Sequence, residues 1–130
     1  MNFCIAVHGA PYGSDAHQRA LKLARSVLTC GHDITRIFFY HEAVAVALTT
    51  AVAPQDEFDA RRAWVNFHNE SGVELAVCIA NGVKRGVLSA SEAKRHEIQS
   101  HTLEAPFELV GLGQLIDGCL TAERYIEIPA

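Results

Sequence analysis

The sequence lacks the patterns that mark common cysteine, metal and nucleotide sites. No CxxC pair occurs among its four scattered cysteines, which argues against a zinc ribbon or a thioredoxin-type dithiol. Its seven histidines show neither HxxxH nor HExxH spacing, so we expect no metal site. The turn at 9–14 matches neither GxGxxG nor a P-loop, so a plain tight turn is favoured over a phosphate site.

Membrane and nucleic-acid signatures are missing as well. No apolar run approaches the roughly 20 residues of a membrane span, and no basic region precedes the first apolar residues, so we expect a cytoplasmic protein with reduced thiols. The 15 Asp and Glu outnumber the 11 Lys and Arg, and the formal net charge is -4. Because binding to phosphates requires a basic face, we expect no direct contact with nucleic acid, and another protein would hold any nucleic acid that is involved.

What the sequence does contain is an alternation of short apolar runs with helical periodicity. A chain of 130 residues that is 49% hydrophobic predicts one domain over 1–130. Strands are predicted at 3–7, 34–40, 75–79, 107–110 and 125–128, and helices at 14–31, 54–69, 89–98 and 112–120, with 42–53 either helix or loop. This order predicts an α/β fold of three layers, α/β/α, with a mostly parallel five-stranded sheet, as in flavodoxin-like proteins.

Chemistry in such sheets gathers at the carboxyl ends of the strands. Cys78 is the strongest candidate there, because it lies near the carboxyl end of a buried strand and is followed by two cations, Lys84 and Arg85. A thiolate is the nucleophile in sulfur transfer, and neighbouring cations favour it. Asn81 and Gly82 lie in the same segment, where glycine would let backbone amides approach a bound sulfur. The alternative of an inert, buried strand cysteine stays open.

The other candidates are weaker. Cys4 and Cys119 are expected in the core, the latter on an apolar helix stripe, and Cys30 is expected to be partly exposed. Tyr12 is a candidate for lining a pocket at the strand ends. His41 is a candidate acid, base or partner contact, although an exposed loop histidine fits it better.

Several motifs, in order and at similar spacing, resemble the TusD/DsrE family of sulfur-relay proteins over nearly the whole chain. They are the segments IFFYHE at 37–42, PQDEFD at 54–59 with Ala63-Trp64, VCIA at 77–80 with Arg85-Gly86-Val87, and GLGQL at 111–115. The resemblance implies a DsrE/F-like subunit that needs no cofactor and acts as a sulfurtransferase, with a persulfide on Cys78. Lys84, Arg85, Asn81 and Gly82 would then stabilise the persulfide anion.

The resemblance also implies partners. TusB-like and TusC-like subunits would complete a heterohexamer, a TusA-like protein would donate sulfur, and a TusE-like protein would accept it for 2-thiolation of the tRNA wobble uridine. Three alternatives stay open: DsrE-type trafficking in dissimilatory sulfur oxidation, a non-catalytic scaffold subunit, and a flavodoxin-like binder of a mononucleotide or flavin. The relay requires the Cys78 thiol to be reachable from outside the fold.

Overall fold

Five strands form one sheet in the computed structural model, which describes residues 1–130. The strands are β1 (Asn2–Val7), β2 (Asp33–Phe39), β3 (Glu74–Cys78), β4 (Phe107–Val110) and β5 (Arg124–Ile128). They are ordered β4-β3-β2-β1-β5, and every neighbouring pair is parallel. β1 and β3 are apolar after their first residue, as strands covered on both faces should be. β2 is apolar throughout only in its last three residues, at 37–39. The predicted five-stranded parallel sheet is confirmed, with strand ends shifted by one residue at most.

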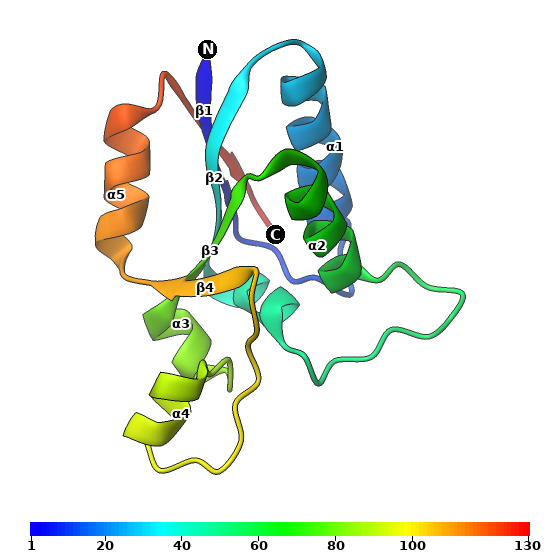
Figure 1. The fold of residues 1–130 in the computed structure, drawn as a ribbon. Helices are drawn as coiled ribbons and strands as arrows, with labels where there is room; N and C mark the ends of the chain where they lie inside the picture. The colour runs from blue at the N-terminus through cyan, green and yellow to red at the C-terminus, as the bar shows by residue number, and fades with distance from the viewer.

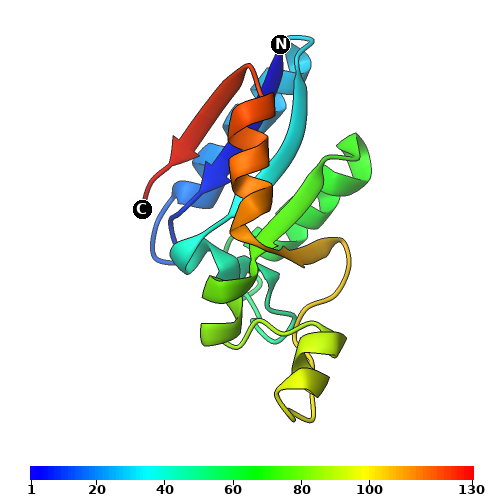
Figure 2. The ribbon, with the colours of Figure 1, turned by 90° about the vertical axis from the view of Figure 1, so that its left-hand side faces the viewer.

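Helices lie on both faces of this sheet. α1 (Ala16–Thr29) and α2 (Ala60–Ser71) cover one face, and α5 (Leu112–Thr121) covers the other (Figures 1 and 2). The short elements η1 (His41–Ala47, a 3-10 helix), α3 (Ile79–Lys84) and α4 (Ala90–Arg95) gather beyond the carboxyl ends of the strands, at the bottom of Figure 1. The predicted three-layer architecture is therefore confirmed. None of the helices has the length and apolar character that crossing a membrane requires.

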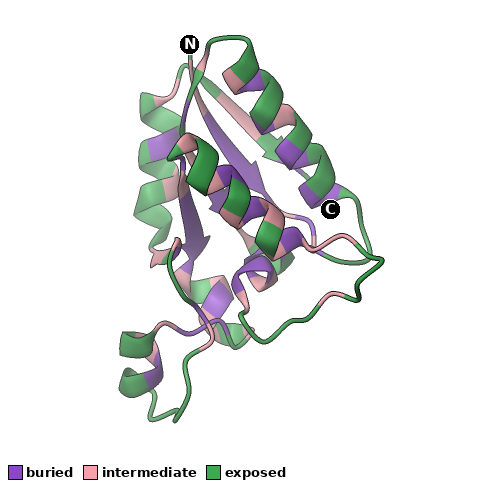
Figure 3. Cartoon of the chain, turned by 45° about the vertical axis from the view of Figure 1, so that its right-hand side comes forward, coloured by how far each residue is buried: buried purple, intermediate pink, exposed green.

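The main core lies between the sheet and the pair α1 and α2, where Figure 3 shows the buried positions of both helices turned inward. Trp64, Phe39 and Phe67 are fully buried there. His17 is buried with them, accepting a hydrogen bond at Nδ1 from Trp64 Nε1 (2.9 Å) and contacting the Gly9 carbonyl through Nε2 (2.9 Å). This histidine is held as a neutral ring inside hydrocarbon.

The opposite face is covered more thinly. α5 buries only Gly118, whose missing side chain lets the helix backbone lie against β1: a Cβ there would be 2.8 Å from Cys4 Sγ. Cys4 is buried and Cys30 is exposed, as predicted, but the prediction of a buried Cys119 is wrong. Because α5 meets the sheet along the line through Gly118, most of its apolar stripe faces outward, namely Leu112, Ile116, Cys119 and Leu120.

Three predicted helix starts can be compared with the observed caps. Ser14 does not cap α1: Asp15 holds that position, and Ser14 Oγ donates to the Ala10 carbonyl (2.9 Å). The second helix does not start at 54, because residues 54–59 form a turn followed by an extended segment. Asp59 is the N-cap of α2, and its carboxylate accepts a hydrogen bond from the Arg62 amide (3.0 Å). The predicted helix start at Ser89 is confirmed, since its Oγ accepts from the Glu92 amide (3.2 Å). The reciprocal half of the capping box is not formed, because the Glu92 carboxylate pairs with Arg95 and His96 instead.

Two predicted segments end differently from the expectation. The helix predicted to reach 98 stops at Arg95, and Glu97 takes a left-handed backbone (φ 57°) that breaks the helical path. The ambiguous stretch 42–53 divides into two parts. Its first residues belong to η1, and the rest is an extended loop that projects to the right of α2 in Figure 1.

Candidate functional site

Cys78 lies where a strand passes directly into a helix. It is the last residue of β3, opposite Val110 of β4, and it is also the N-cap residue of α3, so the strand predicted to reach 79 ends one residue earlier. β3 is hydrogen-bonded to β2 on one side and to β4 on the other. The backbone around the thiol is therefore held rigidly at the carboxyl end of the sheet, where the sequence placed it.

The thiol is closed off from solvent, and the expectation of a reachable thiol is wrong for this conformation. Cys78 is only 1% exposed. None of the surface hollows on the chain is lined by it. η1 packs against both β3 and α3, the two elements that meet at Cys78, and it buries Ala43 and Val44 completely. We call η1 the cover of this site, and any reaction of the thiol with another protein would require part of it to move.

A chain of hydrogen bonds leads from the thiol to a guanidinium group. Asn81 Nδ2 donates to Cys78 Sγ (3.2 Å). Arg85 Nη1 donates to both oxygens of the same asparagine, the backbone carbonyl (3.2 Å) and Oδ1 (3.4 Å). The contact with arginine orients the side-chain amide so that its NH₂ group faces the sulfur. Two of the predicted anion-stabilising residues thus lie together at Cys78.

Glu42, which the sequence did not identify as a site residue, completes this network. Its Oε1 accepts from Arg85 Nη2 (2.6 Å) and Nε (3.1 Å). Hydrogen bonding to the guanidinium holds the pKa of Glu42 below its usual value, and the same contact raises the pKa of Arg85. The two residues are 43 positions apart, so no local pattern in the sequence reveals the pair.

Lys84 and Gly82 occupy different environments from those expected. Lys84 is exposed at the end of α3 and makes no hydrogen bond or ion pair. Gly82 is buried, and a Cβ there would lie 3.2 Å from Leu109 Cδ2 and 3.4 Å from Val87 Cβ. The absence of a side chain at this glycine lets α3 pack closely against its neighbours. Neither residue makes a hydrogen bond to the Cys78 thiol, whose donor is Asn81.

His41 and Tyr12, the two predicted rim residues, lie in separate places. His41 begins η1 with a left-handed backbone (φ 49°), and its ring lies 4.2 Å from Tyr40 and 5.3 Å from His8, measured between ring centroids. It is exposed and adjoins Glu42 in the chain. Tyr12 instead lines a hollow of about 280 Å³ beside Glu57, on the α1 side of the molecule. The structure therefore brings His41, and not Tyr12, to the Cys78 network.

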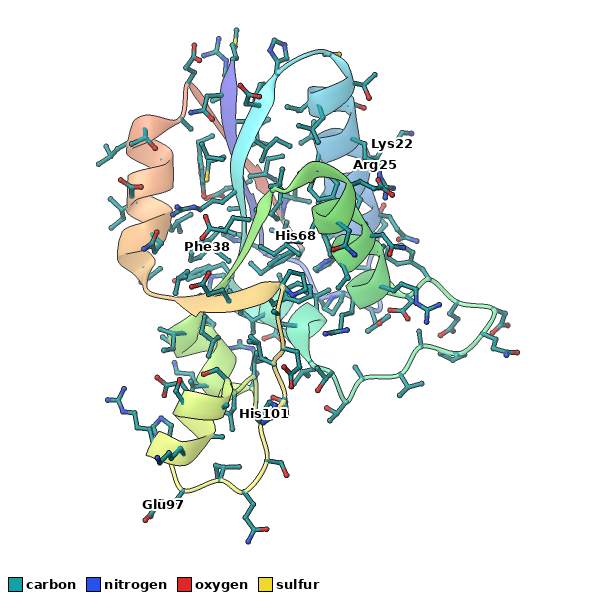
Figure 4. All side chains as sticks on the ribbon, in the orientation of Figure 1. Lys22, Arg25, Phe38, His68, Glu97 and His101 are labelled. Atoms are coloured by element: carbon teal, nitrogen blue, oxygen red, sulfur yellow. The ribbon has the colours of Figure 1, made fainter.

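Apart from the neighbouring rings of His8 and His41, the histidines lie on separate parts of the molecule. Figure 4 shows His68 on α2 and His101 in the segment before β4, on separate parts of the fold. His68 Nδ1 contacts the Val73 carbonyl (2.8 Å), and His101 pairs with Glu104. No group of three or more His, Cys, Asp or Glu side chains is arranged to hold a metal ion. The network around Cys78 is thus built from a thiol, an amide and one ion pair.

Comparison with known proteins gives a consistent family. Residues 1–128 match the model of the DsrE/DsrF-like family. The chain is 42% identical over 126 residues to "Sulfurtransferase TusD homolog" of Pseudomonas aeruginosa, covering 97% of this chain and 95% of that protein. It is 39% identical over 127 residues to "Sulfurtransferase TusD" of Klebsiella pneumoniae, covering 98% and 99%. The resemblance read from the sequence is confirmed.

Solved structures agree at the level of the fold. The crystal structure of the ychN protein from E. coli superposes with a TM-score of 0.76 at 22% identity and covers 98% of both chains. A protein of unknown function from Methanobacterium thermoautotrophicum superposes with a TM-score of 0.60 at 11% identity and covers 97% of both chains. These similarities concern the fold alone, and they agree with the predicted α/β architecture.

Proposed function

The chain belongs to the DsrE/DsrF-like family, and we propose that it carries sulfane sulfur as a persulfide on Cys78. Sulfur transfer is the activity in the names of its curated relatives, and the prediction of a sulfurtransferase is confirmed at that level. The observation that supports Cys78 as the carrier is its hydrogen bond from Asn81, which Arg85 holds in place. Donors of this kind stabilise a sulfur anion more strongly than a neutral thiol.

The proposed chemistry is two successive exchanges at one sulfur atom. The Cys78 thiolate attacks the outer sulfur of a donor persulfide, the donor's S–S bond breaks, and the donor leaves as a thiolate. The outer sulfur is then bonded to Cys78 as a persulfide. An acceptor thiolate attacks that same outer sulfur, and Cys78 departs as a thiolate. Each step breaks one S–S bond and forms another, so no external oxidant, reductant or cofactor is needed.

The finer parts of the proposal concern partners and destination. We assign the donor to a TusA-like protein, the acceptor to a TusE-like protein, and the assembly to a heterohexamer with TusB-like and TusC-like subunits. The sulfur would end as 2-thiouridine at the tRNA wobble position, with the relay acting in the cytoplasm. The names of the TusD relatives support this destination over dissimilatory sulfur oxidation, which would use the same exchange.

Mass spectrometry of the protein after exposure to a persulfide donor tests the carrier assignment. One added sulfur atom should map to the peptide that contains Cys78, and the gain should vanish in Cys78→Ser. Cys30→Ser is the matched control, because it removes an exposed thiol far from the network and should leave the added sulfur in place. Labelling confined to Cys30 or Cys119 would refute the assignment.

A scaffold subunit is the second candidate, and the 1% exposure of Cys78 favours it. A scaffold needs no accessible thiol, and its role would be to hold partner subunits that perform the exchange. The two functions separate in a reconstituted relay. Cys78→Ser stops sulfur transfer if this chain is the carrier, and leaves transfer intact if the chain is a scaffold.

A further inference from the structure

The buried thiol and the exposed ion pair beside it point to a mechanism of access. We propose that Glu42 is a positioning residue of this site: its ion pair with Arg85 holds η1 over Cys78 until an incoming persulfide anion replaces the carboxylate on the guanidinium. The proposal rests on the proposed function, because it assigns a role in sulfur exchange to a residue that does not touch the sulfur.

The ion pair joins the cover to the site. Glu42 belongs to η1, whereas Arg85 follows α3, the helix that begins directly after the thiol. The pair is the side-chain salt bridge that links these two elements, with its shortest distance at 2.6 Å. η1 also packs against β3 and α3 through apolar side chains. Releasing the ion pair would remove the side-chain salt bridge between η1 and the site. The apolar packing would remain, together with backbone hydrogen bonds just outside the two ends of η1, from Tyr40 to Val7 (2.9 Å) and from Thr49 to Thr102 (2.8 Å).

Competition for one guanidinium couples opening to the arrival of substrate. Arg85 directs Nη2 and Nε at Glu42, while Nη1 stays on Asn81. A guanidinium group presents its donors in a planar fork that suits one anionic partner at a time on each edge. A persulfide anion that takes the edge now used by Glu42 would leave the contact with Asn81 unchanged.

Exposure decides which partner moves. The Glu42 side chain is 64% exposed and can turn into solvent, where a carboxylate is well hydrated. The Arg85 side chain is 28% exposed and is tied to α3 through Asn81. The carboxylate therefore leaves and the cation stays, so that opening of the cover delivers a free positive charge to the sulfur.

Alkylation of Cys78 by iodoacetamide, followed on its peptide by mass spectrometry, measures access directly. Glu42→Gln keeps the shape of the side chain and removes its charge. We expect Cys78 to react about two- to fivefold faster in this variant, the range that follows from losing one exposed ion pair. Asp15→Asn is the matched control, because it breaks another exposed carboxylate–arginine pair (2.9 Å to Arg19) on α1. It should react at the wild-type rate.

Salt and a charge swap make the test specific. Raising NaCl to about 0.5 M should accelerate alkylation of the wild type and leave Glu42→Gln unchanged, because salt screens a pair that only the wild type has. Glu42→Arg combined with Arg85→Glu should restore the slow alkylation by rebuilding the pair. The same double variant should take up sulfur more slowly than the wild type, because its cation now lies on η1.

The outcomes separate this proposal from the function on which it rests. If Glu42→Gln alkylates at the wild-type rate at both salt concentrations while Cys78 still gains sulfur, the role of Glu42 is refuted and the carrier function stands. If Glu42→Gln speeds alkylation but no form of the protein gains sulfur on Cys78, the ion pair controls access and the carrier function is refuted.

Discussion

The buried histidine of the main core makes the stability of this protein sensitive to mild acid. Burial lowers the pKa of His17 from 6.5 to about 4, and the contact with the Gly9 carbonyl offsets only part of that shift. Trp64 Nε1 already donates a hydrogen bond to His17 Nδ1. Protonating Nδ1 would therefore place two N–H donors against each other and break this hydrogen bond. The folded state therefore keeps this ring neutral, whereas the unfolded chain protonates it near its ordinary pKa.

The sign and size of the effect follow from this difference. Above pH 6.5 the ring is neutral in both states and the full stability is present. As the pH falls from 6.5 toward 4, the unfolded state gains a proton that the folded state does not, so stability is lost. Between pH 7 and pH 5 the two pKa values correspond to a loss of about 2 kcal/mol in the free energy of unfolding.

Urea unfolding of the wild type and of His17→Gln at pH 7 and pH 5 measures this loss. Glutamine does not titrate here, so the variant should lose about 2 kcal/mol less than the wild type over that interval. Gln18→Ala alters the exposed, non-titrating neighbour of His17 and is the matched control, with the pH dependence of the wild type. Equal losses in the wild type and in His17→Gln would refute the reasoning.

Three further outcomes are expected. Asn81→Ala removes the hydrogen bond to Cys78 Sγ, and hydrogen bonds to charged groups contribute about 1.5–3 kcal/mol. Sulfur uptake, followed over time by mass spectrometry, should therefore slow about tenfold or more. An unchanged rate would exclude a role for the amide. Gly118→Ala should lower the free energy of unfolding by about 1–3 kcal/mol, and by less in a Cys4→Ala background, because its Cβ would overlap the Cys4 sulfur. Asp59→Ala removes the N-cap of α2 and should cost about 1 kcal/mol in urea unfolding, whereas no change would mean that the cap is dispensable.

The sheet was predictable because its signal is local. Continuous apolar runs such as 3–7 and 75–78 have few alternatives to a strand buried on both faces, and their order then fixes a parallel sheet. The position of Cys78 at a strand end follows from the same runs. The helix start at 54 was wrong because proline and aspartate at 54–56 resemble start signals, whereas the acid that caps the helix comes later, at Asp59.

The closed state of the site was not predictable, because it depends on contacts between distant segments. The stretch 42–53 is rich in alanine and valine, a composition that fits a helix, a loop or a cover equally well. The ion pair of Glu42 with Arg85 joins residues 43 positions apart. The prediction of a buried Cys119 was wrong for a related reason. An apolar stripe indicates a helix, but only the close approach of Gly118 to Cys4 shows which side of that helix packs against the sheet.

Hydrogen bonding of β3 to strands on both sides fixes the position of the Cys78 backbone. If Cys78 is the nucleophile, as we propose, it does not move to its substrate, so the part that moves must be the segment that covers it, η1. In the proposed relay, turnover would then be limited by the rate at which η1 moves away from the thiol. A higher concentration of sulfur donor would then raise the rate of sulfur transfer only up to the rate of that motion.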